Sequence, residues 1–312
     1  MTISIIIPNY NGEKLLPKNL PAVFSAAKYY EEKTKNKTEV IIVDDYSEDS
    51  SIKVLEKLHF PIKLIKNKEN LGFSSSIHIG TKAAVGSILV LLNSDVAPQE
   101  DFLLPLIEHF ENEMIFGVGC MDKSIEGEKV ILRGRGVGSW KRGFLAHARG
   151  EVDKVNTLWV NGGSGAFRKS IWETLGGFDQ IYNPFYWEDI DLSYRAQKAG
   201  YSCLFESGSV VIHRHEEGAI VKKYSSWQIK TIAYRNQCIF VWKNITDFSL
   251  LLSHVIWLPY YITRAIFSMD SAFLMGFFLA VLKLGEVVQR RMQNKVLFVK
   301  TDKEVMNSAL NI

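Results

Sequence analysis

Cysteine is scarce in this chain. Cys120, Cys203 and Cys238 are the only cysteines among 312 residues, and they lie far apart in the sequence. An odd number of widely spaced cysteines fits neither a disulfide framework nor a cysteine-based zinc site. We therefore expect the protein to work in a reducing compartment.

A strong charge of one sign is missing as well. The formal net charge is +3 on 312 residues, so composition gives no indication of a nucleic-acid partner. No basic segment precedes the first apolar run, which begins at Ile3. We therefore expect no signal peptide at this end of the sequence.

Two common nucleotide-binding motifs are also absent. The sequence contains no GxxxxGK(S/T) motif, which argues against a P-loop NTPase. No GxGxxG follows the first apolar run, which argues against a dinucleotide-binding Rossmann domain. The glycine-rich run at residues 134–138 has the wrong spacing and no apolar strand leads into it. We expect a flexible loop there.

The residues that are present predict a folded α/β protein. Hydrophobic residues make up 47% of the chain and charged residues 23%, which is enough apolar surface to offset chain entropy. The length suits one large α/β domain with an appendage, or two small domains. Short apolar runs alternate with longer amphipathic stretches. The runs are residues 3–7, 40–43, 62–65 and 88–92.

These runs are β-branched or leucine-rich and mostly continuous, as expected for strands buried on both faces. Helix patterns lie between and after them, and strand–helix alternation predicts a parallel sheet. The helix patterns are residues 19–30, with Asn19 as N-cap and Pro21 in the first turn, a stretch from near Ser47, residues 73–85, and residues 99–112 after Pro98.

Polar clusters follow three of the predicted strands, at residues 8–12, 44–47 and 93–95. Because ligands bind outside the carboxyl ends of strands in open parallel sheets, we expect the clusters to converge on one rim. Asn, Asp and Ser are also ordinary turn and N-cap residues, which is the alternative interpretation. The carboxylates suit a nucleotide base and ribose, and a divalent cation on a diphosphate.

Eight short motifs together resemble the inverting glycosyltransferases of family 2, which have the GT-A fold. The motifs are IIIPNYN at residues 5–11, VDDYS at 43–47, ENLGF at 69–73, NSD at 93–95, NGGSGAFR at 161–168, GGFD at 176–179, WEDIDL at 187–192, and His213. They cover about residues 2–220 in the family's order. The resemblance is greatest to the bacterial rhamnosyltransferase-like branch, whose members build cell-surface polysaccharides.

The resemblance implies a site for a nucleoside-diphosphate sugar. Pro8 and Asn9 would line the base and ribose, and Asp45 would recognise the nucleobase. Asn70 and Gly72 would lie near the nucleotide. Gly72 allows close approach of the backbone, and the helix that follows can favour an anion. The alternative is that residues 70–72 are simply a turn that enters a helix.

Residues 93–95 stand where the family carries Asp-x-Asp. Asn93 replaces the first acid, so Asp95 is the only strong metal ligand of the motif and the site is short of negative charge. His213, which follows an apolar run, is the implied second ligand, with His215 as the alternative. A histidine ligand suits Mn²⁺ better than Mg²⁺, although either cation fits the expectation.

Residues 187–200 predict a helix, with an Asp191–Arg195 pair at i,i+4 and Gly200 after its end. Glu188 and Asp189 would then lie in its first turn, where acids are common for dipole reasons. The resemblance gives Asp189 the role of the base that takes the acceptor hydroxyl proton, with Glu188 as a supporting contact. Because a helix N-terminus lowers a carboxylate pKa, a desolvated site would have to raise it.

The neighbouring segments allow more than one interpretation. The glycines at residues 162–165, Gly163 among them, suggest a backbone that passes close to donor and acceptor. Trp159 and Trp187 could form a platform for a sugar or belong to the core. Residues 122–158 are rich in glycine and cations, which is typical of a solvated loop. An anionic acceptor such as a lipid-linked pyrophosphate, held by arginines, is the alternative.

The C-terminal region changes character. Residues 248–262 and 272–282 are apolar on nearly every side, and each run is shorter than the ~20 residues that span a bilayer. Cations flank the runs: Lys222, Lys223, Lys230, Arg235 and Lys243 before them, and Lys283, Arg290, Arg291 and Lys295 after them. This pattern favours an interfacial or re-entrant anchor on the cytoplasmic leaflet over a full span, a buried core or an oligomer interface.

These observations predict two parts. Residues 1–220 form a GT-A domain with a mostly parallel sheet flanked by helices, and residues 221–312 form a helical, membrane-associating extension at the cytoplasmic face of the cell membrane. The expected partners are a dTDP- or UDP-sugar, a glycan or lipid-linked saccharide acceptor, a divalent cation and the membrane surface. The alternatives are a non-catalytic membrane-tethered subunit and a sugar-1-phosphate nucleotidyltransferase. The second would need a glycine-rich basic loop, which residues 9–14 do not supply.

Overall fold

The computed structural model describes residues 1–214 and 223–310. A nine-stranded mixed sheet runs through the N-terminal two thirds of the chain, in the order β3-β2-β1-β4-β10-β6-β11-β5, with β7 paired to β6. The strands are β1 (Thr2–Asn9), β2 (Lys37–Asp44), β3 (Ile62–Lys66), β4 (Ile88–Leu92), β5 (Val96–Pro98), β6 (Ile115–Glu126), β7 (Lys129–Arg133), β10 (Ser164–Arg168) and β11 (Ser202–Arg214). Strands β1 to β4 are parallel, as predicted, and β10 runs antiparallel between β4 and β6.

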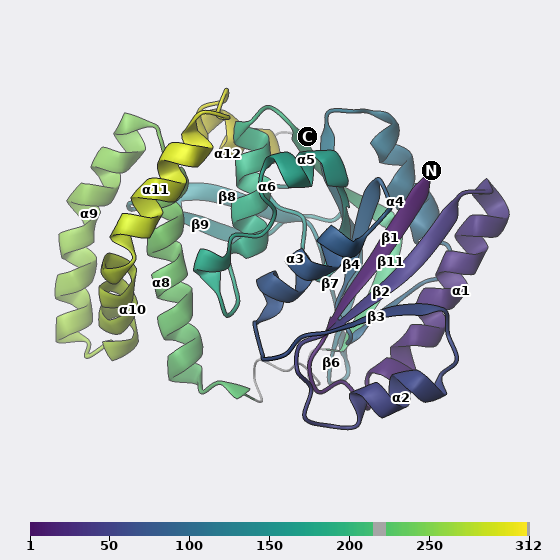
Figure 1. The fold of residues 1–312 in the computed structure, drawn as a ribbon. Coiled ribbons are helices and arrows are strands. Elements are labelled where there is room, and N and C mark those ends of the chain that lie inside the picture. Colours follow the sequence, from purple (N-terminus) through teal and green to yellow (C-terminus); the bar gives the residue numbers. More distant parts are fainter. Residues whose placement is uncertain (215–222, 311–312) are drawn as a thin grey trace.

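Helices cover both faces of this sheet (Figure 1). On one side lie α1 (Leu16–Thr34), α2 (Ser51–Lys57) and α4 (Leu103–Glu108), followed by a 3-10 turn at His109–Glu111. On the other side lie α3 (Phe73–Ala83), α5 (Lys169–Thr174) and α6 (Glu188–Lys198). Successive residues of β1 point to opposite faces, so Ile5 and Ile7 join the first core whereas Ile6 joins the second. The continuous apolar runs are explained by this double burial.

Three helix starts differ from the sequence prediction. Helix α1 begins at Leu16, so Asn19 is not an N-cap but lies inside the helix, where its side chain donates to the carbonyl of Ser94 at 2.8 Å. Helix α2 begins at Ser51 rather than near Ser47, because the Ser47 side chain bonds Asp44 instead. Helix α4 begins at Leu103, later than residue 99. The Asn19 and Ser47 side chains are thus used in contacts with other residues and not as helix caps. Before α4, the turn at Gln99–Phe102 precedes the first helical residue.

Residues 122–158 are not the solvated loop that their composition suggests. Strand β6 continues to Glu126, β7 pairs back onto it, and β8 (Gly136–Lys141) and β9 (Phe144–Arg149) form a separate hairpin. The expected flexible loop at residues 134–138 is also wrong. Arg135 is 3% exposed and donates to the carbonyls of Asn156 and Ala309. A Cβ at Gly136 would lie 2.2 Å from the ring of Trp159, so this glycine serves tight packing.

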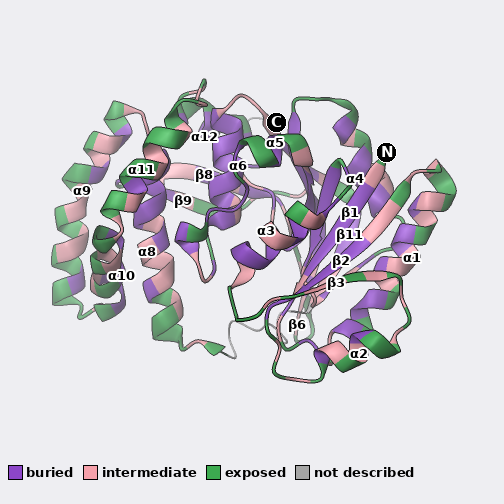
Figure 2. Cartoon of the chain, in the orientation of Figure 1, coloured by how far each residue is buried: buried purple, intermediate pink, exposed green. Residues whose placement is uncertain are grey.

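The described residues after Ser225 form five helices: α8 (Ser226–Asn244), α9 (Phe248–Phe267), α10 (Ser271–Leu282), α11 (Leu284–Lys295) and α12 (Asp302–Leu310). They pack beside the β8–β9 hairpin and α6, and α9, which is mostly exposed, lies with α10 at the far end of the molecule (Figures 1 and 2). Helix α9 has 20 residues, so the helix continues beyond the apolar run at residues 248–262. In the described residues α9 alone suits a membrane crossing by length and composition, and α10 with α11, bent by 64°, would add a second if they formed one span.

Candidate active site

The carboxyl ends of β1, β2 and β4 bring the predicted polar clusters to one rim. Pro8 and Asn9 end β1 beside Val43 and Asp44 of β2. The Asn9 amide donates to the Asp44 carboxylate at 2.8 Å, and the Asn9 carbonyl accepts the backbone N–H of Asp45 at 2.8 Å. The side-chain oxygen of Asn9 is buried and has no hydrogen-bond partner. An unpaired buried acceptor at this rim fits a ligand that donates a hydrogen bond.

Asp45 organises the loop that follows β3. Its carboxylate accepts the backbone N–H groups of Leu71 at 2.9 Å and Gly72 at 2.8 Å. Its backbone carbonyl accepts the Asn70 side chain at 3.1 Å. Gly72 has φ +86° directly before α3, a conformation that favours glycine. The predicted residues Asp45, Asn70 and Gly72 therefore form one connected unit. Asn67, which also donates to Asp45 at 2.8 Å, was missed by the sequence analysis.

The candidate metal ligands also meet. The two ring nitrogens of His213 lie 3.2 Å from Asp95 and 3.0 Å from Asp122. Burial lowers the pKa of His213, but the hydrogen bonds and charges of Asp122 and Asp95 outweigh it and raise the pKa to about 9. Asp122 was missed because its segment reads as a loop. His215 lies outside the described residues.

The fit of this site to a cation rests on Asp95. Its second carboxylate oxygen is buried and has no hydrogen-bond partner, so one anionic oxygen is available for a ligand. Among residues 1–214 and 223–310, no group of three or more His, Cys, Asp or Glu side chains has an arrangement that could hold a metal ion by itself. The protein donors therefore suit a cation that takes its remaining ligands from a diphosphate and water.

The glycine run before β10 closes the rim next to Asn93. The backbone N–H of Asn93 donates to the Gly163 carbonyl at 2.9 Å. A Cβ at Gly163 would lie 2.5 Å from the Asn93 amide nitrogen. The backbone of Gly163 thus packs against the protein's own Asn93, and a larger residue would displace that side chain.

Glu188 and Asp189 begin α6, as predicted; Glu188 is buried and Asp189 is half-buried. Glu188 is 8% exposed and one of its carboxylate oxygens is buried without a hydrogen-bond partner. Asp189 accepts the backbone N–H groups of Ile190 at 2.8 Å and Gly162 at 3.4 Å. Because Gly162 adjoins Gly163, the bond to Asp189 connects α6 with the end of β4.

Burial decides the protonation of this pair. It raises the pKa of Asp189 to about 6, despite the lowering effect of the backbone N–H groups. It raises the pKa of Glu188 to about 8, with further repulsion from Asp189. Desolvation therefore raises the pKa of both carboxyls by more than the N-terminus of α6 lowers it. Because the two carboxyls repel each other, they titrate together with pKa values of about 6 and about 8, so the pair binds about one proton near pH 7.

The two tryptophans have different surroundings. Trp187 is 6% exposed and packs against Phe240 of α8, with ring centroids 5.0 Å apart, so it belongs to the core. The His147 ring lies edge-on to both Trp187 and Trp159, at 5.1 and 5.6 Å. His147 is a member of this aromatic group that the sequence analysis missed.

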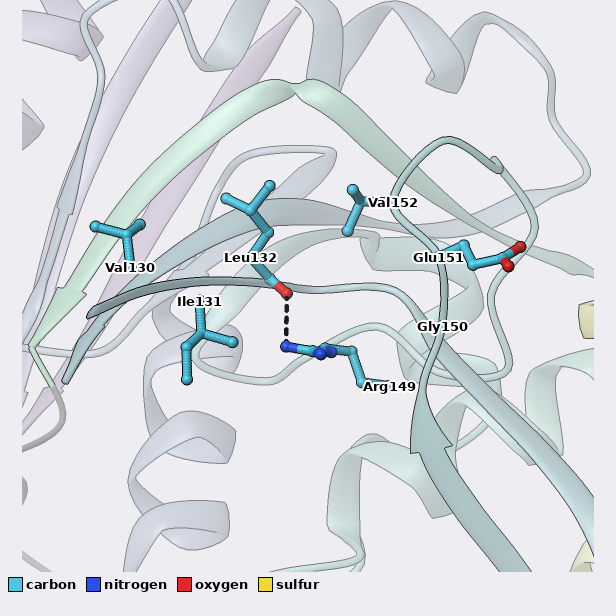
Figure 3. Close-up of a pocket in the computed structure, with 7 residues that line it drawn as sticks. All are labelled: Val130, Ile131, Leu132, Arg149, Gly150, Glu151 and Val152. Atoms are coloured by element: carbon cyan, nitrogen blue, oxygen red, sulfur yellow. Dashed lines mark hydrogen bonds between the residues drawn. The ribbon is translucent and has the colours of Figure 1, made fainter.

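The cations of residues 122–158 do not gather into one phosphate site. Arg133 pairs with Glu126 at 2.7 Å. Arg149 donates to the carbonyl of Leu132 at 3.5 Å, beside an open pocket that contains none of the predicted site residues (Figure 3). The pocket is lined by Val130, Ile131, Leu132, Arg149, Gly150, Glu151 and Val152. The alternative of an arginine cluster for an anionic acceptor therefore gains no support.

The chain is similar to known proteins in sequence and in fold. The model of the family described as glycosyl transferase family 2 matches residues 4–176. The chain is 22% identical over 220 residues to the O-antigen chain rhamnosyltransferase RfbN of Salmonella typhimurium, covering 69% of this chain and 67% of that protein. It is 29% identical over 132 residues to a dolichol-phosphate mannosyltransferase of Pyrococcus furiosus, covering 42% of this chain and 35% of that protein.

Solved structures show the same fold. GalNAc-T7, crystallised with UDP, GalNAc and Mn²⁺, matches 98% of this chain and 56% of its own with a TM-score of 0.68 and 18% identity. TarS of S. aureus, residues 1–349 with UDP-GlcNAc, matches 96% of this chain and 84% of its own with a TM-score of 0.60 and 17% identity. A Pyrobaculum calidifontis mannosyltransferase with GDP-Man and Mn²⁺ matches 90% of this chain and 86% of its own, with a TM-score of 0.55 and 15% identity.

Proposed function

The chain belongs to glycosyl transferase family 2 and has the GT-A fold, and from this premise we propose that it is an inverting glycosyltransferase. It moves a sugar from a dTDP- or UDP-linked donor to a hydroxyl of a glycan or lipid-linked saccharide, in the synthesis of a cell-surface polysaccharide. One observation carries the proposal. The desolvated Glu188–Asp189 pair is bonded to the glycine run that packs on Asn93, two residues from Asp95.

The donor nucleotide is assigned to the rim of β1 and β2. Pro8 and Asn9 line the base and ribose, and the unpaired oxygen of Asn9 accepts a hydrogen bond from the donor. Asp45 holds the loop with Asn70 and Gly72 in place, so that the loop backbone and the α3 N-terminus face the nucleotide. The three structures compared above were solved with UDP, UDP-GlcNAc or GDP-Man, which supports a nucleotide-sugar donor.

A divalent cation, Mn²⁺ or Mg²⁺, is assigned to Asp95 and His213, next to Asn93 and Gly163 at the sugar-diphosphate end of the site. When bound, such a cation offsets negative charge on the leaving diphosphate. Two of the related structures contain Mn²⁺. Asp122 orients His213 through the second ring nitrogen, which is the usual support of a histidine ligand.

Asp189 is assigned as the general base. Its carboxylate takes the proton of the acceptor hydroxyl while the hydroxyl oxygen forms a bond to the anomeric carbon. The bond between that carbon and the diphosphate oxygen breaks on the opposite side, and a single displacement inverts the centre. Glu188, which is protonated at neutral pH, supports the acceptor by donating a hydrogen bond rather than by taking a proton.

Nucleotide binding tests the donor site. We expect one of UDP, dTDP and GDP to raise the melting temperature by roughly 4 °C at about 100 times its Kd, because it binds only the folded state. Mn²⁺ should increase the rise, and Asp95→Ala should remove that increase. Asp101→Ala, which removes an exposed acid outside the site, is the control. If no nucleotide shifts the melting temperature with or without Mn²⁺, the enzyme assignment is contradicted in favour of the non-catalytic subunit.

The proposed location is the cytoplasmic face of the cell membrane, with residues 1–220 as the transferase domain and residues 221–312 as the attachment. Helices α9 and α10 carry a face of exposed apolar side chains, which we call the apolar face: Phe248, Leu252, Val255, Ile256, Ile266, Phe267, Phe278 and Leu282. Exposed apolar patches of this kind mark interaction sites. Arg142 lies over the ring of Trp257 at 5.4 Å beside it, and cations at such an edge favour anionic lipid headgroups.

Vesicle binding tests the attachment. The full chain should sediment with phosphatidylglycerol-containing vesicles, and Ile256→Asp with Phe267→Asp should weaken binding at least about tenfold, because two apolar side chains no longer enter the bilayer. Val85→Asp changes an equally exposed apolar residue elsewhere and serves as the control. A chain that ignores vesicles, or a double variant that binds like the wild type, would contradict this location.

A further inference from the structure

The segment before the proposed base has an unfavourable backbone conformation. Tyr186 and Trp187 have φ values of 70° and 77°, which large side chains rarely adopt. Glu188 and Asp189 follow directly at the start of α6. The position of both carboxylates therefore depends on whatever holds residues 182–187 in this shape.

Helix α8, from the C-terminal part of the chain, holds that segment. The side-chain nitrogen of Asn236 lies 2.9, 3.0 and 2.9 Å from the carbonyl oxygens of Tyr182, Phe185 and Tyr186. Asn236 is fully buried. The neighbouring Arg235 donates to the carbonyl of Asn183 at 2.5 Å. Backbone carbonyls on both sides of the turn are thus bonded to one helix.

Two turns further along, α8 also holds α6 itself. The Lys243 ammonium lies 2.8 and 2.9 Å from the two carboxylate oxygens of Asp191, and the Asn244 amide donates to Asp191 at 2.7 Å. All three side chains are fully buried. Residues seven and eight apart lie on one face of a helix, so Asn236, Lys243 and Asn244 contact the segment and α6 together.

We propose that Arg235, Asn236, Lys243 and Asn244 form a clamp, the α8 clamp, in which Asn236 is a positioning residue for the Glu188–Asp189 pair. The proposal rests on the proposed role of Asp189 as the base. By fixing the turn at Tyr186 and Trp187, the clamp keeps the pair aimed at the site and shielded from water. The helices after residue 225 are thereby part of the active centre and not only an attachment.

Asn236→Ala tests the clamp, because it removes all three carbonyl contacts without adding charge. The assay is release of nucleoside diphosphate from UDP-, dTDP- and GDP-sugars to water, followed from pH 4 to pH 9. We expect kcat to fall at least about tenfold with a donor KM within about twofold, since the loss concerns the base and not the nucleotide. The acid limb of the pH profile should move about one pH unit lower, as water reaches the pair and the pKa of Asp189 returns toward its ordinary value.

Ile239→Val is the matched control, because Ile239 is a buried residue of the same helix outside the clamp. This substitution should at most lower the amount of folded enzyme, and it should leave the acid limb of the pH profile unchanged. If Asn236→Ala does not fold, Arg235→Met removes the contacts from a half-buried position and is read out in the same way. The clamp is overturned if the clamp variant has the wild-type kcat and the acid limb of its pH profile does not move. This result overturns the clamp alone, provided that Asp189→Asn is inactive. A wild-type chain that releases no nucleotide overturns the proposed function as well.

Discussion

Asp189→Asn should abolish sugar transfer while donor binding stays intact. The amide has the shape of the carboxylate and can still accept the backbone N–H of Ile190, so the start of α6 should keep its geometry. It cannot take a proton from the acceptor hydroxyl. Because a general base contributes about 10²–10⁴-fold, we expect kcat to fall by that factor with an unchanged donor KM. Transfer and nucleotide release measure the loss, and the nucleotide-dependent melting shift measures binding.

The pH dependence of activity gives a second test of Asp189 as the base. Wild-type activity should fall as pH drops through about 6, where Asp189 becomes protonated. Glu188→Gln is the matched control, because Glu188 has a pKa of about 8 and is already neutral at pH 7. That variant should keep activity within a few-fold of the wild type near pH 7. If Glu188→Gln is inactive and Asp189→Asn is active, the two roles are exchanged and this assignment is wrong.

The sequence predicted the parts of the fold that depend on local pattern. The continuous apolar runs predicted the parallel strands β1, β2 and β4, since burial on both faces leaves no polar alternation in them. Asp191 and Arg195 do pair at 2.8 Å along α6, as their i,i+4 spacing indicated. Convergence of Asn9, Asp45 and Asn93 on one rim followed from their place after parallel strands.

Other contacts could not be found by local pattern, because their partners are distant in sequence. Asp122 contacts His213 from a segment whose content of glycines and cations is typical of a loop. One of those glycines, Gly136, instead packs against Trp159. Asn236 looks like an ordinary polar residue of a helix until its contacts with residues 182–186 are seen. These residues are defined by tertiary packing, for which no short-range spacing rule exists.

The C-terminal region shows the same limit in another form. The apolar run at residues 248–262 ends before Thr263 and Arg264. In the structure the Thr263 hydroxyl bonds the carbonyl of Pro259 at 2.7 Å, and the helix continues to Phe267. A hydroxyl that bonds the preceding turn does not end a helix, so hydrophobicity alone underestimates the length of this helix.

Asp191→Asn should cause the largest loss of stability. Asp191 is fully buried and accepts hydrogen bonds from Tyr182 at 2.8 Å and from Arg195 at 2.8 Å, in addition to Lys243 and Asn244 of the clamp. Asparagine would present N–H groups to these donors and leave two buried cations with Asp179 as their remaining anion. Breaking a buried ion pair in this way costs about 3–5 kcal/mol of unfolding free energy.

The acid dependence of stability distinguishes this network from simple packing. Burial alone would raise the pKa of Asp191, but the charges of Lys243 and Arg195 outweigh it and hold the pKa well below its ordinary value. A carboxylate whose pKa is lower in the folded state stabilises the fold above its ordinary pKa of about 3.9, and this contribution is lost as pH falls below that value. The difference between wild type and Asp191→Asn in urea unfolding should therefore be full at pH 7 and shrink below about pH 4.

Glu173→Gln removes the exposed partner of the half-buried Lys169 and is the control. It should cost less than about 1 kcal/mol, because water screens exposed charges. If Asp191→Asn costs as little as Glu173→Gln at pH 7, the buried charges do not hold α6 to α8. A loss at pH 7 that persists unchanged in acid would assign the effect to altered packing around Tyr182 instead of to the ionised carboxylate. A loss that shrinks with acid ties the stability of α6, and with it the position of Asp189, to the charge on Asp191.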